Sequence, residues 1–145
     1  MNTNIEEIEK KLAPVDQRTS NEALSGIYSS GYWNDIEEEK KKEWWIADGD
    51  YKRCMNYLIR AGLMNEWAVV VDFVSELPGT DKLKVADLAA GIGWTSALFS
   101  KLDRIGEVHA TEISYHRLAK LFPYAVDMFD ANPEKIRRYI GSFYE

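Results

Sequence analysis

The sequence predicts an α/β protein in which N-terminal helices precede the first half of a parallel, Rossmann-like sheet. Apolar residues recur at helical spacing up to about Leu77, and from Lys84 onward short apolar strands alternate with helical stretches. The order strand, helix, strand, helix, strand is typical of a parallel sheet with right-handed crossovers. We therefore divide the 145 residues into a helical cap region, 1–80, and a partial sheet domain, 81–145, which we expect to be truncated after about three strands.

The cap region carries the pattern of successive amphipathic helices. The first is short and ends at Pro14, which cannot continue a helix. Its apolar face is formed by Ile5, Ile8 and Leu12. Opposite charges three and four residues apart at 37–43 predict a second, exposed helix. Two further helices are predicted at 50–61 and 65–77, and we expect the helices to pack on the sheet.

Three strands are predicted in the partial sheet domain, at residues 85–88, 108–112 and 139–144. Each is a short run of strand-forming residues that is bounded by turn signals. Helices are predicted between them, at 95–102, after the capping residue Ser114, and from Asn132-Pro133-Glu134 onward.

Composition and charge exclude several classes of protein. The net charge of −6 argues against nucleic acid or anionic lipid as partners, because both require clustered Lys and Arg. The basic residues Lys135, Arg137 and Arg138 are interpreted as a solvated helix face, with a small basic patch as the alternative. The single cysteine, Cys54, and the absence of a signal peptide indicate a reducing, cytoplasmic location. No apolar run approaches the roughly 20 residues needed to span a bilayer.

The most informative segment is 87–95, Asp-Leu-Ala-Ala-Gly-Ile-Gly-Trp-Thr, between a predicted strand and a predicted helix. Glycines at such a turn allow close backbone approach to a ligand and present N–H groups at a helix N-terminus. Glu112 ends the next predicted strand, about 20 residues on, where an acidic side chain can accept hydrogen bonds from both ribose hydroxyls.

This pattern fits either a dinucleotide or S-adenosylmethionine (SAM). The dinucleotide fingerprint has a third glycine that accommodates the pyrophosphate, and that position is Ser96 in this chain. SAM has no pyrophosphate, and Asp87 could attract the ammonium group of its methionine part, directly or through water. The simpler alternative, a glycine turn that serves packing alone, stays open.

At these residues the chain resembles the class I SAM-dependent methyltransferases. VADLAAGIGWTS resembles their motif I, and HATEIS resembles the acidic motif that follows, in a match that covers roughly 84–145. The resemblance implies that the methionine end of SAM is lined by Asp87, Ala89, Gly91 and Gly93. It also implies that Glu112 holds the ribose, that Ile113 packs on adenine, and that Ser142 and Phe143 lie near the adenine amino group. Ser142 departs from the family's usual Asp. Ala89 departs from the family's usual Gly. We expect alanine to be tolerated at this position because the residue can keep a negative φ.

The function implied by the resemblance is methyl transfer from SAM to a small-molecule acceptor, and no catalytic residue or metal ligand is assigned. The alternatives are a non-catalytic SAM-binding fragment or remnant and an NAD-type dinucleotide-binding module. The aromatic residues of the cap region either cover the cofactor pocket, as in similar enzymes, or pack helices; they are Tyr28, Tyr32, Trp33, Trp44 and Trp45. Without a fourth strand, residues 85–88 would form an unpaired edge. We expect self-association or a displaced segment to cover this edge. We also expect the 145-residue chain by itself to bind SAM weakly or not at all and to lack methyltransferase activity.

Overall fold

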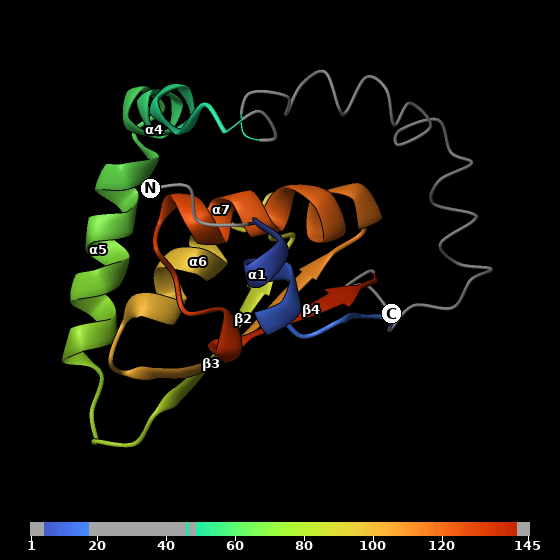
Figure 1. Ribbon diagram of the computed structural model, residues 1–145. Helices are drawn as coiled ribbons and strands as arrows, with labels where there is room; N and C mark the ends of the chain where they lie inside the picture. Colours follow the sequence, from blue (N-terminus) through green and yellow to red (C-terminus); the bar gives the residue numbers. More distant parts are fainter. Residues whose placement is uncertain (1–4, 18–45, 47–48, 142–145) are drawn as a thin grey trace.

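The computed structural model describes residues 5–17, 46 and 49–141, and these residues form an α/β fold (Figure 1). Four parallel strands lie in one sheet in the order β1-β4-β3-β2, and helices pack against one of its faces. The predicted fold class and the predicted parallel sheet are therefore confirmed. The truncation of the sheet remains a prediction.

Two of the predicted strands occur where they were expected. Strand β2 (Leu83–Leu88) and strand β3 (Ile105–Glu112) begin two or three residues before the predicted starts and end at the predicted ends. Strand β4 (Ile136–Ile140) corresponds to the third predicted strand, but it starts three residues earlier. Residues 142–144 of that prediction lie outside the described residues.

The sequence did not predict strand β1 (Val15–Gln17), which pairs with β4. The buried side chain of Arg138 on β4 fastens this segment, because its Nη2 donates to the Ala13 carbonyl at 2.9 Å and its Nη1 donates to the Leu118 carbonyl at 2.7 Å. Burial lowers the pKa of the Arg138 guanidinium. The interpretation of Arg137 and Arg138 as a solvated helix face is therefore wrong, since both lie on a strand.

Five α-helices occur among the described residues, and most of them match predictions. They are α1 (Ile5–Lys11), α4 (Tyr51–Arg60), α5 (Leu63–Glu76), α6 (Trp94–Lys101) and α7 (Phe122–Met128). The charged helix predicted at 37–43 lies outside the described residues. None of the described helices is long and apolar enough to cross a membrane.

Two of the helical predictions were only partly right. The helix expected from Asn132 onward is a single 3-10 turn, Pro133–Lys135, capped by the Asn132 side chain, which accepts from Glu134 N at 3.1 Å. The helix expected after Ser114 begins at Tyr115, passes through a π-helical turn, Arg117–Leu121, and then continues as α7. In both cases the predicted start signal is used, and the length of the regular helix differs.

The two faces of the sheet differ in chemistry. Alternate residues of β3 and β4 are buried beneath the helices, where they pack with Leu118, Phe122 and Val126 of the chain that connects β3 to β4. These buried strand residues are Val108, Ala110, Ile136 and Ile140. The sheet thus contributes one apolar face to the core.

The opposite face, which we call the open face, carries a charged network. Glu107 lies within 3.3 Å of Lys84 Nζ, 3.3 Å of His109 Nε2 and 3.5 Å of Arg137 Nε. The His109 ring stacks on Tyr139, with ring centroids 5.5 Å apart and an interplanar angle of 8°. No helix of the described residues covers this face (Figure 1). The charged side chains on this face pair with one another.

Candidate functional site

The glycine loop, residues 89–93, connects the carboxyl end of β2 to the N-terminus of α6. The Ala90 N–H donates to the Thr111 carbonyl at 2.9 Å, and the Gly93 N–H donates to the Ala90 carbonyl at 2.9 Å, so the loop is tied both to β3 and to itself. Three of its residues have left-handed backbone conformations, with φ of 57° at Ala89, 58° at Gly91 and 84° at Gly93. This curvature turns the chain from strand to helix within five residues.

Ala89 departs from the expectation of a negative φ. With φ of 57° the residue has a left-handed backbone conformation, which costs an L-residue about 1–2 kcal/mol relative to glycine because its Cβ crowds the backbone. The structure therefore gives a physical reason why glycine suits this position. Strain held at a loop beside a cavity is a common property of binding sites.

Glu112 joins the glycine loop to the end of β3. Its Oε2 accepts from Gly91 N at 2.8 Å, and its Oε1 accepts from Ile113 N at 2.9 Å and from Ser114 N at 3.0 Å. The residue is only 4% exposed. A carboxylate has about four acceptor positions, so three backbone donors leave about one for a ligand hydroxyl.

Asp87 has a structural role at the end of β2. Its Oδ2 accepts hydrogen bonds from Thr95 Oγ1 at 2.6 Å and from Ser96 Oγ at 2.5 Å, and both hydroxyls belong to the first turn of α6. Ser96 is fully buried. The strand end and the helix start are thereby locked together, and Asp87 Oδ1 accepts no hydrogen bond from the described residues.

The two glycines of the loop have different reasons to be glycine. A Cβ added at Gly93 would lie 2.2 Å from Cε2 of the buried Phe122 ring. A Cβ added at Gly91 would meet no atom within 4 Å. Gly93 is therefore required by packing, which supports the packing alternative at that position, whereas Gly91 borders open space.

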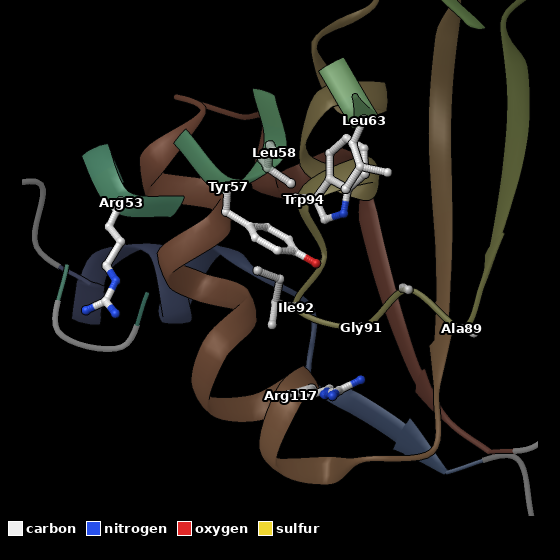
Figure 2. A pocket seen from close by; sticks show the side chains of 10 residues that line it. Arg53, Tyr57, Leu58, Leu63, Ala89, Gly91, Ile92, Trp94 and Arg117 are labelled. Carbon is white, nitrogen blue, oxygen red and sulfur yellow. The ribbon is translucent and has the colours of Figure 1, made fainter. Parts of the chain in front are cut away.

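A cavity of about 570 Å³ opens beside the loop (Figure 2). Its floor is formed by the loop and the start of α6, and its other wall by α4 and the start of α5, with Arg117 at one side. The residues from outside the loop are Arg53, Tyr57, Leu58, Leu63, Trp94 and Arg117. The Tyr57 side chain extends from α4 toward the loop, and its hydroxyl points into the space in front of Ile92 and Gly91 (Figure 2).

Helix α4 is held in this position by polar contacts at its N-terminus. Tyr51 donates its hydroxyl to Asp127 Oδ2 of α7 at 2.5 Å, and Asp50 caps the helix by accepting from Arg53 N at 3.0 Å. Burial, followed by the hydrogen bond to Asp127, raises the pKa of the Tyr51 phenol, which stays protonated. The wall of the cavity is thus anchored to the core that carries the loop.

The structure brings most of the predicted site residues together at the carboxyl ends of β2 and β3. Ala89 and Gly91 line the cavity, whereas Asp87, Gly93, Glu112 and Ile113 support the loop from behind or beside it. Ser142 and Phe143 lie outside the described residues, as do Tyr28, Tyr32, Trp33, Trp44 and Trp45.

Sequence reasoning did not anticipate the residues that α4 and the π-helical turn contribute. Arg53 and Tyr57, one helical turn apart on α4, had no motif, and Arg117 follows the predicted acidic motif without a signal of its own. Within the described residues there is no group of three His, Cys, Asp or Glu side chains that could hold a metal ion.

Comparisons with protein-family models, with curated proteins and with solved structures found no match to this chain.

Proposed function

We propose that the cavity beside the glycine loop binds SAM. We propose further that this chain is the cofactor-binding part of an enzyme that transfers the methyl group of SAM to a small-molecule acceptor. The observation that carries this proposal is the hydrogen bond of 2.8 Å between Gly91 N and Glu112 Oε2 at the edge of a cavity of about 570 Å³. It joins a glycine loop and an acidic strand end, the two halves of the motif from which the resemblance was drawn. The cavity volume is within the range of small-molecule sites, about 300–1,000 Å³.

Glu112 supports the proposal, but its existing hydrogen bonds restrict how many ribose hydroxyls it can accept. Because three of its acceptor positions are used by backbone N–H groups, it can accept one ribose hydroxyl without loss of an existing contact. A second ribose contact requires Gly91 N to release Oε2. Binding and loop movement are then coupled, and ligand binding should change the exchange rate of the Gly91 amide, which loses its acceptor.

Methyl transfer from a sulfonium is an in-line displacement in which the acceptor forms a bond to the methyl carbon as the carbon–sulfur bond breaks. The donor is already activated, so the protein contributes mainly positioning. In this proposal α4 forms the acceptor side of the cavity, with Tyr57 and Leu58 opposite the glycine loop. That placement assigns the described part of the 1–80 cap region a role in holding the acceptor.

Titration with S-adenosylhomocysteine and SAM, followed by calorimetry, tests the proposal. A Gly91→Val side chain would occupy the open space in front of the loop and should abolish binding. Gly79→Val is the matched control, because Gly79 also has a positive φ and no atom within 4 Å of an added Cβ, but lies before β2, at the other end of the strand. Equal affinity in the two variants, or no binding by the unaltered protein, would contradict the proposal.

The second candidate is an NAD-type dinucleotide site, and one observation favours it. Arg53 and Arg117 line the cavity, and guanidinium groups recognise phosphates well. NAD that bound more tightly than S-adenosylhomocysteine in the same titration would select this candidate. A third outcome, SAM binding without turnover for any acceptor, would fit a non-catalytic SAM-binding remnant. We also propose a cytoplasmic location, since the single cysteine, Cys54, is a buried residue of α4.

A further inference from the structure

Strand β2 is the edge of the sheet on the side nearest the glycine loop. It pairs only with β3 among the described strands, so one side of its backbone is unpaired there. Its residues alternate between partly buried and exposed, and Leu88 at its end is 56% exposed. Natural proteins normally pair or cover such an edge, because its N–H and C=O groups can hydrogen-bond to another strand.

Helix α5 extends past this edge on the covered face of the sheet. Trp67 packs edge-on against Phe99 of α6, with ring centroids 4.8 Å apart, and Val74 belongs to the same core cluster as Val85 of β2. Figure 1 shows α5 as the outermost helix, beyond α6, running down to the loop from which β2 starts upward. Because α5 reaches the core through side chains such as Trp67 and Val74 and lies beyond α6, we infer that it overhangs the place where a further strand would lie.

A second, exposed apolar stripe on α5 faces this place. Val69 is 68% exposed and Phe73 is 62% exposed. Each precedes by one residue a side chain that packs on the core, the partly buried Val70 and the buried Val74. Consecutive residues are turned by about 100°. Because α5 runs antiparallel to β2 and is right-handed, that turn directs the exposed stripe toward the plane of the sheet outside β2.

We propose that the β2 edge and the Val69–Phe73 stripe form a docking site for one extended polypeptide segment of a partner, added as a fifth strand beneath α5. The spacing fits a strand. Residues four apart on a helix are about 6 Å apart along its axis, and alternate residues of a strand are about 6.6 Å apart. Two apolar side chains of a bound strand would therefore meet Val69 and Phe73 in register.

Charge at the ends of the stripe adds to its specificity. Glu66 and Glu76 continue the same line on α5 and are both exposed, about 15 Å apart at the rise of an α-helix. In a strand that has two central apolar residues and a basic residue at each end of the same face, the two basic residues are about 20 Å apart. Flexible lysine side chains can make up the difference from the separation of the two glutamates. The partner segment is thus apolar at its centre and basic at its ends.

A second copy of this chain fits the site less well. Two copies that pair antiparallel through β2 in one continuous sheet are related by a two-fold axis perpendicular to that sheet, so both helix layers lie on the same face. The overhanging α5 of one copy would then occupy the space of the partner copy's helices. A single strand without a helix on that face avoids this conflict.

The test uses the palindromic peptide Lys-Thr-Val-Thr-Val-Thr-Lys, which presents the same face in either strand direction. Binding is measured by calorimetry, and amide hydrogen exchange of Leu83–Leu88 is measured with and without peptide. We expect saturable binding and at least tenfold slower exchange at the outward-facing amides of β2. The variant Val69→Ser/Phe73→Ser should weaken binding at least tenfold, whereas Ile59→Ser, at a similarly exposed position on α4 that is 57% exposed, should not change it.

The same peptide N-methylated at every Val and Thr is the chemical control, because it retains the side chains and loses the backbone donors that strand addition needs. Equal binding of the methylated peptide would overturn strand addition. Failure of the parent peptide to bind would overturn the docking site. Protection of β2 that rises with protein concentration would show that a second copy is the occupant. These outcomes do not depend on S-adenosylhomocysteine binding, which tests the function separately.

Discussion

Substitution of Gly93 by alanine should destabilise the protein much more than the same change at Gly91. The added methyl at Gly93 would lie 2.2, 2.3 and 2.6 Å from three carbons of the Phe122 ring, which is fully buried. Overpacking of this kind costs about 1–3 kcal/mol, and a side chain at φ of 84° adds about 1–2 kcal/mol. We therefore expect a loss of about 2–5 kcal/mol for Gly93→Ala.

Two other glycines separate these two contributions. Gly91→Ala and Gly79→Ala place a methyl group at positive φ with no atom within 4 Å, so each should cost only about 1–2 kcal/mol. The free energy of unfolding is measured for all three variants by urea denaturation. The excess cost at Gly93 isolates the contact with Phe122.

A double-mutant cycle then tests the cause directly. Phe122→Leu removes the ring atoms that the new methyl would meet, so Gly93→Ala should cost less in that background than in the unaltered protein. Equal losses at the three glycines, or additive effects of the Gly93 and Phe122 changes, would refute the packing explanation. Gly93 would then have to be explained by the ligand alone.

Three further predictions concern stability. Ala89→Gly should stabilise the protein by up to about 1.5 kcal/mol in urea denaturation, because relief of the positive φ, about 1–2 kcal/mol, outweighs the added entropy of the unfolded chain, about 0.4–1 kcal/mol; a loss of stability would contradict the strain at this position. The hydrogen bonds from His109 and Lys84 lower the pKa of Glu107 below 4.5, so its contribution to stability is present above that pH and is lost as the pH falls through the lowered value. Glu107→Gln should therefore flatten the acid side of the stability profile, and an unchanged profile would exclude this network. Arg138→Met keeps the apolar stem but removes charged donors from two carbonyls, so it should cost about 2 kcal/mol and speed amide exchange in β1; unchanged exchange would show that β1 does not depend on Arg138.

The parts of the fold that depend on local sequence could be predicted. Residues of β2 and β3 combine apolar alternation with turn signals at both ends, and the loop between β2 and α6 needs the conformational freedom of glycine. The position of Glu112 followed from its place at the end of β3. Each of these inferences uses residues that are close together in the sequence, so the sequence alone was sufficient to predict them.

The parts that depend on distant contacts could not be predicted. Strand β1 is three residues long and gains its position from β4 and Arg138, more than 100 residues later in the chain. The cavity wall depends on the hydrogen bond from Tyr51 to Asp127, which joins two helices with no shared motif. Arg137 and Arg138 followed a helix start signal, and only pairing with β3 shows them to be strand residues.

The polar and apolar surfaces of the sheet indicate where a further element would pack against its described part. A doubly wound sheet has helices on both faces, and its strands are apolar on both. Here buried and partly exposed residues alternate along β3 and β4, and the open face carries the Glu107 network. A second helix layer would remove water from these charges, which is unfavourable in free energy. That face is suited to water. The unsatisfied element is instead the edge of β2, whose carboxyl end leads directly into the glycine loop. In open α/β sheets the ligand lies in a crevice outside the carboxyl ends of the strands. A strand added beneath α5 would therefore pair the edge and form the missing side of that crevice at once.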